Sequence, residues 1–521
     1  MKRRDFIKVG AVVGGLSVLD LRSAKWAHAA QNKVLNIVVQ PEPPGIQLGI
    51  YQNGPSQMIA GNIYDGLLRY DENLTPEPNL ATSWEVSDDK LKYTFHLKEG
   101  VTWHDGEPFT AHDVVFSADD FLRQTHARHR TNMDAVESIE ALDDHTVVFT
   151  LKNPVGPFMG IFEVGSMPMI PKHIYEGTEY RDNPANNHPI GTGPFKFKEW
   201  RKGSYIHLVR NDNYHESELP YIDEVYFHVI PDAVSRAAAY ESGRVDVLPG
   251  GSVEYFDLPR ITELPDTEVT EKGWEFFSPL AWMWLNNRIP AFQDKRARQA
   301  AMYALDRQAM VDVVMQGYGK VATGPFHSSV LYHTDEGRQY EYNPDKAREL
   351  LKESGYNGEK LTMIPLPYGE AWQRIAEMAR QNLIDAGFNI ELVATDLATR
   401  NQRIENWDFD ISFTYLYQYG DAALGVSRNY ISSAINKGSL YNNVEGYENP
   451  EIDRLFAEGA IEVDPEKRAA IYEEVQKILC EDVPIAWLFE MSFPTVYRSR
   501  VENIVNSAVG INDGLARTRM S

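Results

Sequence analysis

The order of its strand and helix patterns is the feature that most constrains how this chain can fold. Short runs typical of β-strands come early, and long runs with helical periodicity come later. We expect strands at 34–39, 92–97 and 146–151 and helices at 294–316, 344–353, 370–386 and 465–481. Mixed strands first, then helices that alternate with strands, predict an α+β region followed by an α/β region.

The chain has 521 residues and contains no internal repeat, low-complexity tract or Gly/Ser-rich linker. At roughly 150 residues per domain, this length corresponds to about three domains. Because no linker composition separates them, we expect the domains to be joined by short connections.

The charge and the cysteine content exclude several classes of protein. With 75 acidic and 51 basic side chains, the net charge of -24 repels phosphate backbones and anionic lipids, so we expect no nucleic-acid partner and no binding to a membrane surface. The single cysteine, Cys480, allows no intramolecular disulfide and no cysteine-rich zinc site. It is interpreted as a helix core residue.

The first thirty residues have the pattern of an export signal. Basic residues 2–4 precede the apolar stretch 9–21, and the small-residue site 27–29 fits cleavage before Ala30. The run RRDFIK at 3–8 resembles a twin-arginine signal, whose pathway carries folded proteins. No cysteine follows the apolar stretch, and no second run is long enough to span a membrane. We therefore predict a signal peptide over 1–29 and a soluble, periplasmic mature protein without a lipid anchor.

Catalytic signatures are absent from the sequence. It contains no G-x-S-x-G elbow, H-E-x-x-H helix, P-loop or C-x-x-C pair. His104, Asp105 and Glu107 are interpreted as a structural turn, and His126 and His129 as part of a solvated, charged helix face. We expect no cofactor, no metal and no catalytic residue. An exported enzyme, the alternative from another class, would require such a signature.

Two further motifs are interpreted as scaffold. Thr110 followed by Asp113 three residues later predicts a capping box at the start of a helix. The glycines of the segment 191–194, GTGP, are expected to permit a sharp crossing of the backbone between domains.

Ordered motifs give the chain a resemblance to a known family. The run YDGLLRYDENLTPEPNLATSWEVSDDKLKYTFHLKEGVTWHDGEPFTAHDVVFS at 64–117 resembles the signature region of the bacterial family 5 extracellular solute-binding proteins. Further similar segments follow in the family's order: IGTGPF at 190–195, RARQA at 296–300, YALDR at 303–307, NPDKA at 343–347 and GYENPEID at 446–453. The resemblance therefore covers about the whole mature chain.

The resemblance implies a two-lobed α/β periplasmic-binding-protein fold of type II, similar to cluster C, with an extra inserted subdomain. Lobe I is expected to be discontinuous, with hinges near Asn286 and Phe493. The implied division is lobe I from 31–60, 189–288 and 491–521, the inserted subdomain from 61–188, and lobe II from 289–490.

The strand expected at 409–419 supplies most of the candidate ligand-binding residues. Its alternation places Tyr415, Tyr417 and Tyr419 on one face, and Gly420 ends the strand. Ligands of open α/β sheets bind beyond the carboxyl ends of strands, which favours these tyrosines and Asp421 as cleft residues. The alternative is that the aromatic face is core and that Asp421 caps the next helix.

In this region the sequence departs from the pattern of peptide-binding family members. These members carry a Gly-Trp-x-x-Asp stretch whose aspartate pairs with the α-amino group of the peptide. Here the tryptophan position falls at Tyr415 or Leu416, and Asp421 comes two or three residues late. Asp421 could still accept a ligand ammonium, and Arg428 could donate to a ligand carboxylate.

A second group of candidates comes from elsewhere in the chain. Trp282 and Trp284 share one face of an expected strand, where one of them could stack on a ligand, and paired core tryptophans are the alternative. The loop at 40–44 and residues 51–56 are expected to approach the cleft. Glu42 is the charged residue of that loop.

The resemblance implies a binding component of an ABC importer. It would capture a small peptide or a peptide-like solute between its lobes, act as a monomer and deliver the solute to an inner-membrane permease. Because family relatives also bind nickel chelates, opines, glutathione and oligosaccharides, a metal chelate, an opine or another non-peptide solute stays open as the alternative.

Overall fold

The computed structural model describes residues 33–521, which form one compact unit. The expected signal peptide at 1–29 lies outside the described residues. Within 33–521, no helix is both long and apolar enough to cross a membrane.

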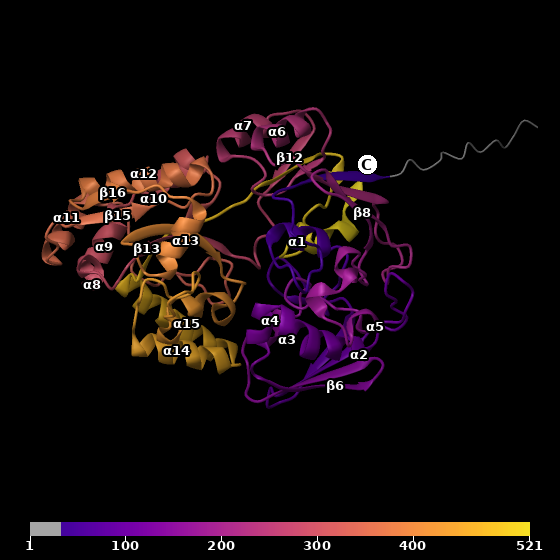
Figure 1. Ribbon diagram of the computed structural model, residues 1–521. Coiled ribbons are helices and arrows are strands. Elements are labelled where there is room, and N and C mark those ends of the chain that lie inside the picture. Colours follow the sequence, from indigo (N-terminus) through magenta and orange to yellow (C-terminus); the bar gives the residue numbers. More distant parts are fainter. Residues whose placement is uncertain (1–32) are drawn as a thin grey trace, which may run out of the picture. The chain divides into compact units, whose positions relative to one another are not determined.

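The first of two large sheets is assembled from three distant stretches of the chain (Figure 1). Parallel pairing of β1 with β10, from Val34 opposite Glu224 to Val39 opposite Val229, forms its centre. In spatial order its strands are β12 (Thr267–Thr270), β19 (Thr495–Arg498), β11 (Val247–Leu248), β1 (Val34–Val39), β10 (Glu224–Val229), β9 (Tyr205–Arg210) and β8 (Phe195–Arg201). We call the region built on this sheet lobe I.

The second large sheet is formed mainly by strands from the later, α/β part of the sequence. We call the region built on this sheet lobe II. Its strands are, in spatial order, β14 (Lys320–Val321), β18 (Ile485–Glu490), β13 (Pro279–Leu285), β17 (Ile411–Tyr417), β15 (Lys360–Ile364) and β16 (Asn389–Leu392). Every residue of β13 is buried, which fits its uninterrupted apolar sequence.

The position of β13 corrects the expected domain boundary. The segment 189–288 was assigned to lobe I, but β13 pairs with β17 and β18 of lobe II. Asn286 likewise lies in lobe II, where its amide donates to the Phe409 carbonyl at 2.7 Å. The chain therefore crosses between the lobes just before Pro279, where Ser278 has a left-handed φ of 49°, and crosses back between Glu490 and Thr495.

The expected inserted subdomain contains a four-stranded antiparallel sheet. Its strands are β4 (Ala81–Val86), β5 (Lys92–Leu97), β7 (Thr146–Leu151) and β6 (Val136–Asp143), in that spatial order. Short helices accompany them: α2 (Ala111–Val115), α3 (Leu122–Thr125), α4 (Ala127–Asn132) and α5 (Lys172–Tyr175). The hairpin of β2 (Leu68–Tyr70) and β3 (Pro76–Pro78) leads into this sheet. The strands expected at 92–97 and 146–151 are confirmed.

The helices of lobe II begin and end where their sequences provide caps. In α11 (Pro344–Glu353), Asn343 accepts a hydrogen bond from the Lys346 amide and proline occupies the first turn. α12 (Glu370–Asp385) and α15 (Pro465–Asp482) confirm two further expected helices. The remaining helices here are α8 (Pro290–Gln293), α9 (Lys295–Ala304), α10 (Arg307–Ala309), α13 (Leu397–Glu405) and α14 (Pro450–Ile461). Lobe I contributes α1 (Gly54–Ala60), α6 (Ala233–Glu241), α7 (Leu258–Thr262) and α16 (Ile511–Gly514).

The helix expected at 294–316 is interrupted. α9 ends at Ala304, Leu305 has an extended backbone, and Asp306 then caps α10 by accepting from the Ala309 amide. A local capping interaction thus overrides a continuous helical pattern.

Two scaffold motifs behave as expected, and one pair of histidines does not. Thr110 and Asp113 form the predicted capping box. A side chain at Gly191 would lie 2.0 Å from the Ile63 carbonyl oxygen, so this glycine allows the close backbone crossing. His126 and His129, expected on a solvated face, are instead buried and bond the carbonyls of Gly165 and Ala118. Burial lowers the pKa of His126 to about 3 and that of His129 to about 4.

Candidate functional site

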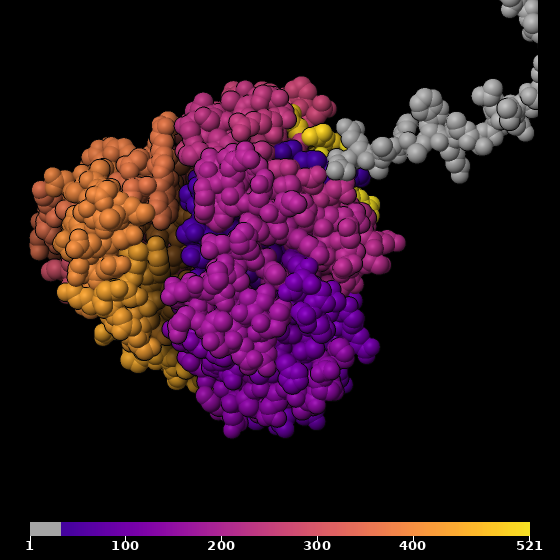
Figure 2. All heavy atoms as spheres, turned by 45° about the vertical axis from the view of Figure 1, so that its right-hand side comes forward, coloured from indigo at the N-terminus to yellow at the C-terminus, as the bar shows by residue number. Residues whose placement is uncertain are grey.

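A cavity of about 660 Å³ lies between lobe I and lobe II. In the space-filling view, a furrow separates the orange and yellow surface of lobe II from the indigo and magenta surface opposite (Figure 2). The lining comes from both lobes and from the return crossing at 491–495. This volume falls in the range of about 300–1,000 Å³ that is typical of small-molecule sites.

The aromatic wall of the cavity is the continuation of β17. Ile411 and Phe413 are fully buried in the lobe II core, whereas Tyr415, Tyr417 and Tyr419 are half-buried and line the cavity. The alternation predicted from the sequence therefore carries one face of β17 from the core into the cavity as far as Tyr417, while Tyr419 follows the strand with a left-handed φ of 52°.

Neighbouring rings hold this wall in place. Tyr415 stacks on Trp372 of α12 with centroids 6.1 Å apart and packs against Phe493 of the return crossing at 5.7 Å. Tyr417 packs against Phe277 of lobe I at 5.3 Å. Burial raises the pKa of Tyr415 to about 12, so its phenol stays neutral and can donate or accept a hydrogen bond.

The facing wall of lobe I combines a glycine-containing loop with side chains such as Trp274 and Phe277. The loop 249–252 follows β11 and lines the cavity, and a side chain at Gly250 would lie 2.3 Å from the Phe493 carbonyl oxygen. Buried Arg236 holds this loop by donating to the carbonyl of Ser252 and, at 2.9 Å, to that of Ile230. Gly250 thus lets the loop approach the return crossing closely.

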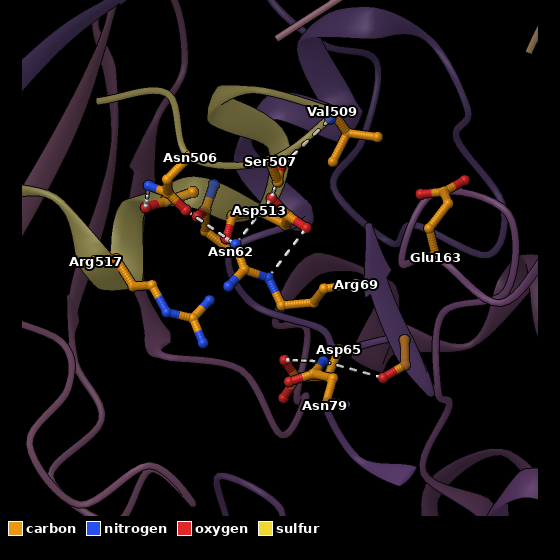
Figure 3. Close-up of polar contacts among 12 residues, drawn as sticks. Asn62, Asp65, Arg69, Asn79, Glu163, Asn506, Ser507, Val509, Asp513 and Arg517 are labelled. Atoms are coloured by element: carbon orange, nitrogen blue, oxygen red, sulfur yellow. Dashed lines mark hydrogen bonds and ion pairs between the residues drawn. The ribbon is translucent and has the colours of Figure 1, made fainter. Parts of the chain in front are cut away.

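Residues 509–512 complete the lobe I wall and are fixed by a buried polar network (Figure 3). Arg69 pairs with Asp513 at 3.3 Å and donates to Asn506 at 2.9 Å, while Asn62 donates to the Ile511 carbonyl at 2.9 Å. Because these partners come from the first and last parts of the chain, the network ties the C-terminal segment to the core of lobe I.

Asp421 does not line the cavity. Its two carboxylate oxygens accept from Arg468 of α15 at 2.6 and 2.8 Å, and one of them also accepts from the Ala423 amide at 2.9 Å. The side chain is almost fully buried. The carboxylate therefore serves as the helix cap that was the alternative interpretation, and it also forms an internal ion pair.

Arg428 lies beside the aromatic wall but is absent from the lining of the cavity. Its guanidinium donates to the Tyr417 carbonyl at 3.4 Å and lies 5.9 Å from the Tyr419 ring, on which Arg128 of the inserted subdomain also rests at 4.3 Å. Burial lowers the pKa of Arg428, and the nearby positive charge of Arg128 adds to this effect.

The other candidates are separated from the cavity as well. Trp282 and Trp284 are fully buried in the core of lobe II, which corresponds to the core alternative. Glu42 accepts hydrogen bonds from the Trp200 indole and the Gly203 amide, both at 2.9 Å. Its neighbours Gln40 and Pro41, in contrast, do line the cavity. We therefore retain the three tyrosines and remove Asp421, Arg428, Trp282, Trp284 and Glu42 from the proposed site.

Sequence reasoning missed several lining residues, among them Glu254, Trp274, Tyr368, Trp372 and Phe493. A usable signal existed for the loop that contains Glu254. The loop follows β11, which runs parallel to β1, and it begins with the glycine pair 250–251. By the strand-end rule, this pair marks a second position where backbone can approach a ligand.

Comparison with known proteins assigns the chain to a family. The sequence profile described as bacterial extracellular solute-binding proteins, family 5 middle, matches residues 75–437. Oligopeptide-binding protein AppA of Bacillus subtilis is 30% identical over 474 residues, which cover 86% of this chain and 83% of that protein. Heme-binding protein A of Haemophilus influenzae is 28% identical over 494 residues, which cover 88% and 87% of the two chains.

Solved structures agree with this assignment. The substrate-binding protein CtaP of an ABC transporter of Listeria monocytogenes matches with a TM-score of 0.85 at 27% identity, covering 94% of this chain and 99% of that one. The structure of Bacillus subtilis AppA in complex with a nonapeptide matches with a TM-score of 0.78 at 26% identity, with 94% and 99% covered. The chain belongs to the family 5 bacterial extracellular solute-binding proteins.

Proposed function

We propose that this protein is the solute-binding component of an ABC importer and that it captures a small peptide or peptide-like solute. The observation that carries the proposal is the cavity between two lobes, whose lining combines aromatic side chains with the glycine-containing loop 249–252. Aromatic rings can pack on side chains of varied shape, while amide and carbonyl groups can bond a peptide main chain. The oligopeptide-binding relative supports this assignment.

The arrangement suits capture by closure of the two lobes. Two crossings, at Phe277–Pro279 and Glu490–Thr495, connect them and can act as hinges. The inserted subdomain also contacts lobe II directly, since the Gly156 amide donates to the Ala460 carbonyl at 2.8 Å. A solute that touches both walls stabilises the closed arrangement in proportion to its preference for that arrangement over the open one. The closed form is then the one that the permease receives.

We propose binding without chemistry, a monomeric state and a periplasmic location reached through the twin-arginine pathway. Replacing Arg3 and Arg4 together by Lys is expected to keep the precursor in the cytoplasm, because that pathway reads the paired arginines. Fractionation and immunoblotting measure the result, and an unchanged periplasmic yield contradicts the proposed route.

Light scattering tests the monomeric state. Mass spectrometry of peptides incubated with the protein tests for hydrolysis, and none is expected.

The decisive test of the function is to identify what the cavity retains. Native mass spectrometry of protein taken directly from the periplasm, followed by calorimetric titration of the released compound, is expected to yield a short peptide. A metal chelate, an opine or heme as the retained compound would replace the peptide assignment and keep the transport role. Failure of any retained or added solute to bind in the cavity would contradict the proposal as a whole.

A further inference from the structure

Glu254 is the one acidic residue among the cavity-lining residues of the described chain. It follows β11 and lies half-buried in the lobe I wall. In residues 33–521 its carboxylate forms no hydrogen bond and no ion pair, although its position precedes a short helical turn that it could have capped. A partly buried carboxylate without donors is unfavourable, and burial accordingly raises the pKa of Glu254.

The charged groups around Glu254 are already committed to other partners. Arg236 attracts it, but its guanidinium donates to the backbone carbonyls of the loop. Glu370 and Asp257 repel it, and these two carboxylates pair with Arg374 and Arg260. These charged groups therefore have hydrogen-bond partners of their own, and neither oxygen of Glu254 receives a donor from residues 33–521.

Glu254 also faces the opposite lobe. A side chain built on Gly369, the residue before α12, would lie 3.3 Å from one of its carboxylate oxygens. Gly369 is flanked in the cavity lining by Tyr368, and Trp372 follows one turn later. A carboxylate next to aromatic rings is an arrangement that attracts a cation through both charge and ring faces.

We propose that Glu254 accepts the ammonium group of the bound solute. This inference rests on the proposed function and names the solute class of the same cavity: a compound with a primary amine, such as a peptide with a free α-amino group, whose apolar part lies on the aromatic wall. An ammonium at this position would supply the donors that Glu254 lacks. Because Glu254 belongs to lobe I and the aromatic wall to lobe II, such a solute links the two lobes.

The test compares three proteins and two forms of one peptide. The proteins are the wild type, Glu254→Gln, and Glu377→Gln as a matched control that removes the same charge from an exposed side chain of α12 outside the cavity. The peptide is the one whose binding the calorimetric titration described above has established. It is used in two forms, with its α-amino group either free or acetylated. Calorimetry measures each affinity, and thermal melts of the apo proteins confirm that all three fold.

A charge-assisted hydrogen bond of ordinary strength predicts a loss of about ten- to hundredfold in affinity. We expect this loss for Glu254→Gln with the free peptide and for the wild type with the acetylated peptide. Glu254→Gln should bind both forms equally, and Glu377→Gln should behave like the wild type. Equal affinity of the wild type for both forms, or an unchanged affinity of Glu254→Gln, would overturn the inference and leave the peptide-binding function in place.

Failure of the proposed function gives a different result. If the retained compound is not a peptide, the same comparison is made with that compound and with its N-acylated form. A primary amine whose binding depends on Glu254 supports the inference and removes the peptide assignment. A bound compound without a cationic group overturns the inference.

Discussion

Asp421 and Glu254 are two carboxylates near one cavity, and their surroundings differ completely. Asp421 is buried and receives two hydrogen bonds from Arg468 and a third from backbone. Glu254 lines the cavity and receives none from the described residues. The fold supplies hydrogen-bond donors to the Asp421 carboxylate but none to the Glu254 carboxylate, so we expect a bound solute to supply them there. Position at a strand end therefore does not identify a ligand group. The better criterion is a cavity-lining polar group that lacks a partner.

Removing Asp421 should give the largest effect. Asp421→Ala leaves the Arg468 guanidinium buried without its partner, so the apo protein should lose about 3–5 kcal/mol of unfolding free energy. Chemical denaturation measures this loss, and Asp421→Asn, which keeps the shape, should lose less. Ligand affinity at a temperature where the variants are folded should stay close to that of the wild type. An unchanged apo stability with a large loss of affinity would reverse the roles of the two carboxylates.

Lowering the pH should have the next largest effect, through protonation of Glu254. Because burial raises the pKa of Glu254, protonation at this site begins above the pH usual for a glutamate. The affinity for an amine ligand should then fall, approaching about tenfold per pH unit below that pKa. A group whose pKa is raised by folding favours the folded state at low pH, so the contribution of Glu254 to apo stability changes in the opposite direction.

Titrations across this pH range with the wild type and Glu254→Gln test the prediction. The pH dependence should be absent in the variant. Persistence of the same profile in Glu254→Gln would assign it to another group.

Substitution of two tyrosines of the aromatic wall should change affinity and stability by smaller amounts. Tyr415→Leu removes a ring that lines the cavity and stacks on Trp372, and it should weaken binding by about three- to tenfold. Tyr419→Leu removes a lining ring that Arg128 and Arg428 also contact, so it should cost about 0.5–1 kcal/mol of stability and weaken binding less than Tyr415→Leu does. Calorimetry and thermal melts on both variants measure the contrast. Equal losses of affinity would show that the two tyrosines contribute equally to ligand binding.

Glu42 should give the smallest effect. Glu42→Gln keeps an acceptor for the Trp200 indole and removes a charge whose hydrogen-bond partners are two neutral donors, so we expect at most about 1 kcal/mol of lost stability. Affinity should change by less than about twofold, since such surface changes rarely propagate. A larger change in affinity would show that this loop transmits the state of its cavity-lining neighbours, Gln40 and Pro41.

Local patterns predicted the elements better than the contacts between them. The strand at 34–39 and the helix at 344–353 were read correctly because alternation and caps lie within the segment itself. The alternation of the expected strand 409–419 was read correctly only as far as Tyr417, because β17 ends there and Tyr419 has a left-handed φ of 52°. The partner of Asp421 could not be predicted from the sequence, because Arg468 lies 47 residues away and only the packing of α15 brings the two side chains together. His126 and His129 were misread because other segments cover them.

The wall formed by Val38–Pro41 on one side and Val509–Asn512 on the other has a consequence for synthesis of the protein. The second of these segments is made long after the first. A nascent chain therefore has no complete cavity until residues 509–512 have been made, and a product truncated before residue 509 lacks part of the wall together with Asp513, which anchors it to Arg69. Solute binding thus reports that this segment is present, and an affinity matrix carrying the solute would retain molecules that contain it and pass shorter fragments.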